Sequence, residues 1–233
     1  MKNYLVVGGS SGIGLEITKH LASKGNKVFV LSRNKNQLEQ DENIKFLSCD
    51  VLSDVELYPS IDSNLNGIAY CPGSINLKPF KSLKEQDYLD DFRLNALGAV
   101  KVINHYLPNL KKVEKSSIVL FSTVAVQTGM PFHTSVSMAK GAVEGLTRSL
   151  AAEYVPNIRV NAIAPSLTDT PMASRLLSSQ EKRESSAKRH PLNSIGKPAE
   201  IANASAYLLS DDSGWITGQI FHIDGGISSL KLL

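Results

Sequence analysis

Residues 4–14 read YLVVGGSSGIG, and more of the architecture follows from this segment than from any other part of the chain. An apolar, β-rich run leads directly into glycines, and Leu15, Ile17 and Leu21 then recur at the spacing of a helix face. Glycines permit a tight turn close to a phosphate, and a helix start offers free N–H groups and the positive end of its dipole. The segment therefore predicts a strand, a turn that binds a cofactor pyrophosphate, and a helix. The expected contacts are Gly8, Ser10, Ser11, Gly12, Ile13 and Gly14.

Outward from this segment, short apolar runs alternate with longer amphipathic stretches. Such alternation predicts βαβ units, and therefore a parallel sheet covered by helices on both faces. We expect an α/β fold, a doubly wound parallel sheet of the Rossmann type, as a single domain over residues 1–233. The expected strands are Tyr4–Val7, Lys27–Leu31, Ile44–Leu47, Gly67–Tyr70, Ser117–Phe121, Arg159–Ile163 and Gln219–Ile223, and the expected helices cover residues 12–24, 82–112, 135–154 and 198–209.

The composition excludes several classes of protein. The net charge is only +3, which favours neither nucleic acid nor a membrane surface as a partner. The apolar run near the start is far shorter than a signal-peptide core, and no later run approaches the ~20 residues of a membrane span. Cys49 and Cys71 have no metal-ligand spacing, so we expect reduced thiols, no metal and a cytoplasmic location.

The ends of the second, third and fourth strands indicate which cofactor is bound. A carboxylate after the second strand would accept hydrogen bonds from the ribose of NAD, but this chain has Ser32, Arg33 and Asn34 there. A guanidinium suits a 2′-phosphate, so the sequence favours NADP(H). Further cofactor contacts are expected at Asp50, Val51, Pro72 and Gly73.

With these pieces in order, the sequence resembles the short-chain dehydrogenase/reductase family, especially its 3-oxoacyl-[acyl-carrier-protein] reductase-like members. The resemblance spans nearly the whole chain. It rests on GGSSGIG, Asp50-Val51, Pro72-Gly73, LNALGAV, SIVLFST, MAKGAVEGLTRSLAAE, IRVNAIAPSLTDTPM, GKPAEIANASAYLLSDDSGWITGQ and FHIDGG.

The resemblance implies hydride transfer between a nicotinamide and a carbonyl or alcohol carbon. In the family a tyrosine passes the proton, a lysine four residues later lowers its pKa and binds the nicotinamide ribose, a serine orients the carbonyl, and an asparagine sustains a water relay. Lys140 matches the lysine and Asn95 the asparagine, while Thr123 takes the serine position and Val136 replaces the tyrosine. Ser122 and Thr123 cannot both face the site on a strand, and we favour Thr123.

Other implied cofactor contacts lie after the sixth strand, with smaller departures from the family pattern nearby. Val7 stands before the first glycine in place of threonine, Cys71 replaces an asparagine, and Ser166 replaces the glycine after Pro165. These changes put the affinity and geometry of cofactor binding in doubt. The implied contacts are Lys140, Pro165, Ser166, Thr168 and Thr170.

Three functions remain open. The first is an NADP(H)-dependent ketoreductase in which His133, Lys140 itself, or a water held by Thr123 and Asn95 donates the proton. Its carbonyl substrate would be a small molecule, free or attached to a carrier protein. The second is an NADP(H)-binding pseudoenzyme or inactive partner subunit, and the third is a non-redox enzyme such as a lyase.

The segment 168–197 and the long helices point to partners. The segment is polar and punctuated by prolines, so we expect a lid that shapes the substrate pocket, with a solvated pair of surface helices as the alternative.

The resemblance implies a homodimer or homotetramer formed through residues 82–112, 135–154 and the C-terminal segment. Leu146, Leu150 and Tyr154 follow helical spacing there, although packing on the chain's own sheet gives the same pattern. The segment 168–197 also carries basic side chains that could bind an acidic carrier protein or could simply be solvated. They are Arg175, Lys182, Arg183, Lys188 and Arg189.

Overall fold

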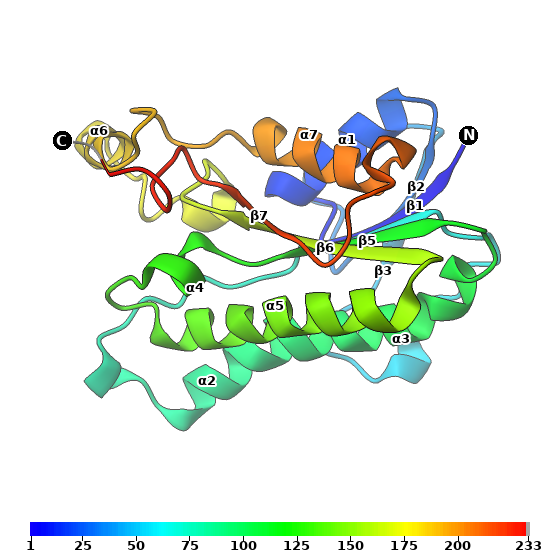
Figure 1. Ribbon diagram of the computed structural model, residues 1–233, viewed down its shortest axis with the longest axis horizontal. Helices are drawn as coiled ribbons and strands as arrows, with labels where there is room; N and C mark the ends of the chain where they lie inside the picture. Colours follow the sequence, from blue (N-terminus) through cyan, green and yellow to red (C-terminus); the bar gives the residue numbers. More distant parts are fainter. Residues whose placement is uncertain (232–233) are drawn as a thin grey trace.

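The computed structural model describes residues 1–231, and Leu232 and Leu233, the end of the expected domain, lie outside the described residues. Its strands form a seven-stranded parallel sheet in the order β3-β2-β1-β4-β5-β6-β7 (Figure 1). Every expected strand is present with small differences at its ends, so the predicted doubly wound sheet is confirmed. The strands are β1 (Asn3–Val7), β2 (Lys27–Ser32), β3 (Ile44–Ser48), β4 (Gly67–Tyr70), β5 (Ser116–Phe121), β6 (Ile158–Pro165) and β7 (Ile220–Ile223).

Helices cover both faces of the sheet because its central strands are apolar on both sides. In β1, Leu5 and Val7 belong to the core beneath α3 and α5, whereas Tyr4 and Val6 belong to the core beneath α1 and α7. Figure 1 shows these two layers on opposite sides of the strands. The helices are α1 (Gly12–Ser23) and α7 (Pro198–Leu209) on one face, and α3 (Gly98–Leu110) and α5 (Thr134–Tyr154) on the other.

The stretch expected as a helix over residues 82–112 is divided in the structure. α2 (Glu85–Phe92) and α3 are joined by a π-helical turn over Arg93–Leu97. Such a turn shifts the hydrogen-bond ladder by one residue, a change that apolar periodicity does not reveal. Helices beyond those expected are α4 (Val124–Thr128) and α6 (Gln180–Lys188), with short 3₁₀ turns at Val55–Leu57, Phe80–Ser82, Pro171–Ala173 and Asp211–Ser213. Across residues 1–231, every helix is too short or too polar to span a lipid bilayer.

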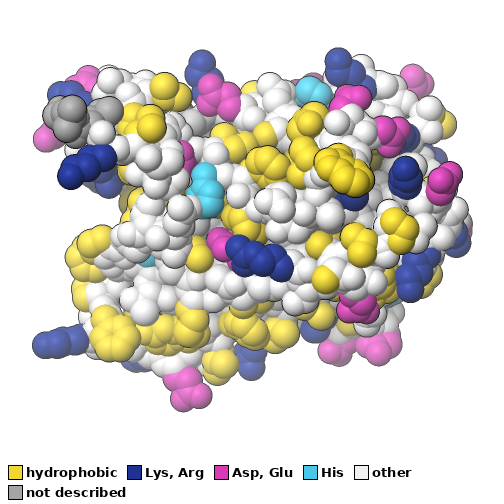
Figure 2. Space-filling model, in the orientation of Figure 1, with side chains coloured by type: hydrophobic (Ala, Val, Ile, Leu, Met, Phe, Trp, Pro, Cys, Tyr) yellow, Lys and Arg dark blue, Asp and Glu magenta, His cyan; other side chains and the backbone are white. Residues whose placement is uncertain are grey.

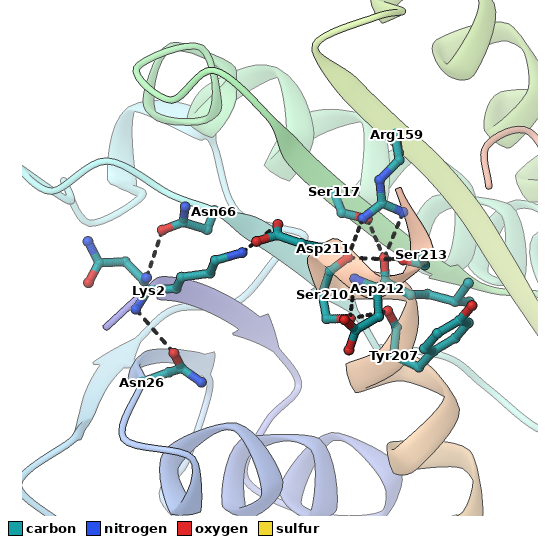
Figure 3. Close-up of polar contacts among 12 residues, drawn as sticks. Lys2, Asn26, Asn66, Ser117, Arg159, Tyr207, Ser210, Asp211, Asp212 and Ser213 are labelled. Atoms are coloured by element: carbon teal, nitrogen blue, oxygen red, sulfur yellow. Dashed lines mark hydrogen bonds and ion pairs between the residues drawn. The ribbon is translucent and has the colours of Figure 1, made fainter. Parts of the chain in front are cut away.

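Where the strands begin, the Arg159 side chain binds the C-terminal end of α7 (Figure 3). Its guanidinium donates to the carbonyl oxygens of Leu208 at 3.0 Å and Ser210 at 2.8 Å. These carbonyls have no intrahelical partner at a helix C-terminus, where a cation is also favoured by the dipole. Lys2 adds an ion pair of 2.6 Å with Asp211 just beyond the helix. The N-terminal strand and the last helix are thereby joined at the edge of the sheet where the strands begin.

Candidate active site

The carboxyl ends of the strands open onto a cavity of about 580 Å³. The strand order reverses between β1 and β4, the switch point at which doubly wound sheets bind their ligands. In Figure 2 the surface is hollowed at the left, the side of α4 and α6 towards which the strands run in Figure 1. All residues expected to contact the cofactor line this cavity: Gly8, Ser10, Ser11, Gly12, Ile13, Gly14, Ser32, Arg33, Asn34, Asp50, Val51, Pro72, Gly73, Lys140, Pro165, Ser166, Thr168 and Thr170.

The loop after β1 has a backbone that glycine alone fits easily. Gly8 and Gly12 adopt φ angles of 73° and 53°, in the left-handed region that L side chains rarely enter. A Cβ on Gly14 would collide with the carbonyl oxygen of Gly8, so the start of α1 can pack against the loop only without a side chain. Ser11 occupies the N-cap and makes no capping hydrogen bond with its side chain. The loop therefore suits close contact with an anion at the helix start.

The end of β2 carries polar groups without protein partners. Ser32 is buried, and its Oγ lacks a hydrogen-bond partner among the described residues. Arg33 is exposed and forms no ion pair within residues 1–231. A hydroxyl and a guanidinium at this position are both suitable donors to the 2′-phosphate of NADP(H). The residues present therefore fit the phosphorylated cofactor.

Lys140 is buried at the centre of the cavity and is held by the end of β5. Its Nζ donates a hydrogen bond of 2.8 Å to the carbonyl oxygen of Phe121. Burial lowers the pKa of Lys140 to about 8, against smaller opposing effects of Cys71 and Asp91. Burial also raises the pKa of the Cys71 thiol to about 12. Lys140 can therefore exchange a proton near neutral pH.

Asn95 lies beside Lys140 although it does not line the cavity. A Cβ on Gly73 would approach Asn95 Oδ1 at 3.2 Å and Lys140 Nζ at 3.4 Å, so the glycine leaves room for both groups. The π turn buries Asn95, and its Nδ2 donates to Ser74 Oγ at 3.0 Å and to the carbonyl of Asp91 at 2.8 Å. Its Oδ1 is buried without a partner among the described residues. This oxygen is an available acceptor for a water or an ammonium group.

Thr123 and Ser122 make different contacts at the start of α4. Thr123 is the N-cap, and its Oγ1 accepts a hydrogen bond of 3.3 Å from the backbone N–H of Ala125. Its own O–H is therefore free to donate into the cavity. Ser122 instead donates to Glu144 on α5 at 2.8 Å. Thr123 is the better placed of the two to orient a carbonyl oxygen.

Val136 forms part of the cavity wall one helical turn before Lys140. Its side chain is 6% exposed, and no hydroxyl or imidazole occupies its place on α5. His133 also lines the cavity, but its Nδ1 lies 2.7 Å from the carbonyl oxygen of Pro131. The cavity wall is thus apolar at Val136.

A polar pair that the sequence did not reveal lies at the end of β6. Ser166 Oγ is 2.8 Å from Nε2 of His190, a buried residue that also lines the cavity. The departure at Ser166 was a signal that this region is unusual, but no motif or spacing pointed to His190. The pair therefore adds a buried imidazole and a hydroxyl to the cavity wall.

The polar segment 168–197 covers this end of the cavity with mixed contacts. Arg183 pairs with Asp169 through two contacts of 2.8 and 3.0 Å, which engages one of the basic residues considered for a carrier. Arg189 lines the cavity, and Met172 and Leu176 add apolar surface. The segment therefore contributes directly to the wall of the cavity.

Comparisons with known proteins bear on this geometry. The family model described as Enoyl-(Acyl carrier protein) reductase matches residues 7–228. Carbonyl reductase family member 4 of Danio rerio is 33% identical, with 97% of this chain and 98% of that protein covered. The 3-oxoacyl-[acyl-carrier-protein] reductase FabG of Thermotoga maritima is 31% identical, with 96% of each chain covered.

Solved structures share the whole fold. Ligand-free aldohexose dehydrogenase of Thermoplasma acidophilum superposes with a TM-score of 0.89 at 27% identity, covering 100% of this chain and 96% of that one. ElxO with NADP bound gives a TM-score of 0.87 at 26% identity, with 99% and 100% covered. The cavity at the switch point thus belongs to an architecture in which at least one similar protein holds NADP.

Proposed function

The chain belongs to the short-chain dehydrogenase/reductase family, and on that premise we propose that it is an NADP(H)-dependent ketoreductase whose active site lacks the usual tyrosine. The observation that carries this proposal is the common cavity. It brings the glycine loop, the Ser32–Arg33 corner, Thr123 and Lys140 to the switch point of the sheet. We propose the cytoplasm as its location, because Cys49 and Cys71 are free thiols.

Each group in the cavity has a role in holding the cofactor. The N–H groups at the start of α1 bind the pyrophosphate, Ser32 and Arg33 bind the 2′-phosphate, and Lys140 binds the nicotinamide ribose. When bound, the reduced nicotinamide supplies a hydride to a carbonyl carbon, or accepts one from an alcohol in the reverse direction.

The substrate carbonyl is held by this chain's own donors. Thr123 donates its free hydroxyl hydrogen to the carbonyl oxygen, and the Lys140 ammonium adds positive charge where the oxygen becomes negative. The apolar wall near Val136, Met172 and Leu176 suits the carbon skeleton of a small ketone. The ketone is free or attached to a carrier protein, and the name of the Thermotoga relative supports the second form.

Loss of the tyrosine lowers the expected rate without removing the reaction. A positioned general acid contributes ~10²–10⁴-fold, while orientation of the reactants is a separate and often larger effect. An activated ketone, whose alkoxide product is a weaker base, depends least on the missing acid. We therefore propose activated ketones as the substrates that this site reduces best.

Val136 also favours a second function, an NADP(H)-binding pseudoenzyme or inactive partner subunit. Its apolar side chain closes the place from which the family donates a proton. Stopped-flow oxidation of bound NADPH by ethyl pyruvate separates the two functions. A single-turnover oxidation that depends on the ketone supports the reductase, whereas tight NADPH binding with no oxidation by any ketone supports the binding protein.

A further inference from the structure

Ser166 and His190 form a hydrogen-bonded pair with a defined direction. His190 Nε2 is 2.8 Å from Ser166 Oγ, and His190 Nδ1 is 2.8 Å from the carbonyl oxygen of Ser186. A carbonyl oxygen can only accept, so Nδ1 carries a hydrogen. In the neutral ring Nε2 then accepts the Ser166 hydroxyl hydrogen. In the imidazolium both nitrogens donate, and the Ser166 hydroxyl hydrogen is released to point elsewhere.

The pair is built into the fold. His190 is 3% exposed, and it packs against Gly225, where an added Cβ would come within 3.2 Å of the His190 Cβ and 3.4 Å of its ring atom Cδ2. Ser166 follows β6 directly, so its position is fixed by the sheet. A buried imidazole with both nitrogens partnered is held in one orientation, which is the requirement for directed proton transfer.

Both side chains belong to the wall that also contains the proposed carbonyl-binding groups. The cavity is lined by Ser166 and His190 as well as by Thr123, Val136 and Lys140. The imidazolium form places a free hydroxyl hydrogen in this cavity, with a second proton behind it on Nε2. Such an arrangement can deliver a proton to an oxygen and replace it at once.

We propose that Ser166 and His190 form a proton relay that takes the place of the missing tyrosine in the proposed reductase. As the carbonyl carbon gains its hydride, the Ser166 O–H bond breaks and an O–H bond forms on the substrate oxygen. The Nε2–H bond of the imidazolium breaks in turn, and its proton passes to Ser166 Oγ. His190 is left neutral, and its Nδ1–H still donates a hydrogen bond to the carbonyl oxygen of Ser186. The ring regains a proton from solvent after the alcohol leaves.

Charged groups lie near His190 in the chain and in the cavity. Arg189 and Lys188 adjoin it on the same segment, and Lys140 lies in the same cavity. Asp224 precedes the contacting Gly225 and accepts from the N–H groups of Gly226 and Ser228. Because the relay starts from the protonated ring, the reduction is expected to slow as pH rises.

The test combines activity with a measurement that needs no turnover. Single-turnover oxidation of bound NADPH by ethyl pyruvate is followed from pH 5 to 9, in H₂O and in D₂O, for the wild type, His190→Gln and Ser166→Ala. His20→Gln is the matched control, because it removes an imidazole that lies outside the cavity lining. NADPH affinity is measured for each variant, and ¹⁵N-histidine NMR of the cofactor-free protein reports the hydrogen on each ring nitrogen.

The expected result is a wild-type rate that falls as pH rises and that slows in D₂O. His190→Gln keeps its NADPH affinity within about twofold, loses ~10²-fold in rate, and loses both the pH dependence and the solvent isotope effect. Ser166→Ala slows the reaction by a similar factor and removes the hydrogen bond at Nε2 from the NMR spectrum. His20→Gln changes none of these.

Two results would overturn the relay, and they are distinguishable. If the wild type reduces ethyl pyruvate and His190→Gln keeps the rate, the pH profile and the isotope effect, the relay is wrong while the proposed reductase stands. If the wild type binds NADPH but reduces no ketone, the proposed function fails and the relay fails with it. In that case the NMR still shows whether the Ser166–His190 hydrogen bond exists.

Discussion

Lys140 on α5 donates a 2.8 Å hydrogen bond from its Nζ to the backbone carbonyl of Phe121 at the end of β5. The bond fixes the ammonium group beside Thr123, which follows Phe121 after one further residue. It also places a charge on a side chain that is only 7% exposed. The same contact thus supports the proposed chemistry and imposes a cost on the folded protein.

Replacing Lys140 with methionine should stabilise the cofactor-free protein at pH 7 by ~2 kcal/mol. Burial lowers the pKa of Lys140 from 10.5 to about 8, which corresponds to a penalty of ~3 kcal/mol while the group is charged. Loss of the bond to Phe121 offsets about 1 kcal/mol of the gain. The melting temperatures of both proteins check this, and NADPH-dependent activity should fall in the variant.

The control is the pH dependence of the stability difference between the wild type and Lys140→Met. Below pH 8 the lysine is charged in both states and the penalty is complete. Between about pH 8 and 10.5 the folded state loses the proton while the unfolded state keeps it, so the wild type gains stability as pH rises. The advantage of Lys140→Met should therefore shrink over this interval, and an advantage independent of pH would contradict the assignment.

In the His190→Gln background, where the proposed relay is removed and a general acid is missing, Val136→Tyr should raise ketone reduction by roughly 10²-fold. The new phenol lies one helical turn before Lys140, whose charge lowers a phenol pKa. Val136→Phe is the matched control, because it adds the same ring without the hydroxyl. A gain in the tyrosine variant alone identifies the acid, and equal rates in both variants would contradict this interpretation. Circular dichroism and NADPH titration show whether the buried site tolerates the larger ring.

NADPH should bind at least tenfold more tightly than NADH, because Ser32 and Arg33 stand where an acidic acceptor would hold the ribose of NAD. Arg33→Ala should weaken NADPH and leave NADH almost unchanged, since the guanidinium is exposed and unpaired within residues 1–231. Fluorescence titration of both cofactors measures this. Equal affinities in the wild type would refute the NADP(H) assignment.

A homodimer or homotetramer should be seen by sedimentation at micromolar concentration. Leu146, Leu150 and Tyr154 pack partly against the chain's own core, so they are not the best contacts for a second copy. Leu97 and Val100 at the start of α3 are 42% and 41% exposed, and hydrophobic side chains gather over the lower helices in Figure 2. Val100→Asp should weaken assembly, with Lys101→Ala as a control for a polar neighbour. A wild type that sediments only as a monomer would remove the assembly proposal.

The fold followed from the sequence because its signals are local and repeated. Most strands are short apolar runs such as Gly67–Tyr70, and glycines such as Gly8 and Gly12 fall in the turn after β1. The π turn at Arg93–Leu97 was missed because an extra residue in one turn leaves the apolar pattern of the flanking helices intact. α6 was anticipated only through the alternative of surface helices in segment 168–197, because its exposed, polar sequence has hardly any apolar face.

The candidate site was predictable where one segment supplies its parts, as in the glycine loop or in the pair Val136 and Lys140 on a single helix. The pair Ser166–His190 was not, because its members come from the end of a strand and the end of a helix, 24 residues apart. For the same reason, the sequence did not predict that Asn95 Oδ1 lacks a hydrogen-bond partner among the described residues. The surroundings of this atom are formed by the π turn and by the residues that follow β4. Contacts made only by tertiary packing leave no periodic trace in a sequence.

The Arg159 cluster and the cavity lie at opposite ends of the same strand. Arg159 stands near the start of β6 and Pro165 at its end, roughly 20 Å apart at ~3.3 Å per residue. Natural variation at the two ends should therefore have separate consequences for a cell. Changes around Arg159 would alter how much protein survives proteolysis, whereas changes around Ser166 would alter what each surviving molecule does. The cellular abundance of this protein and the catalytic activity of each molecule can accordingly evolve almost independently of each other.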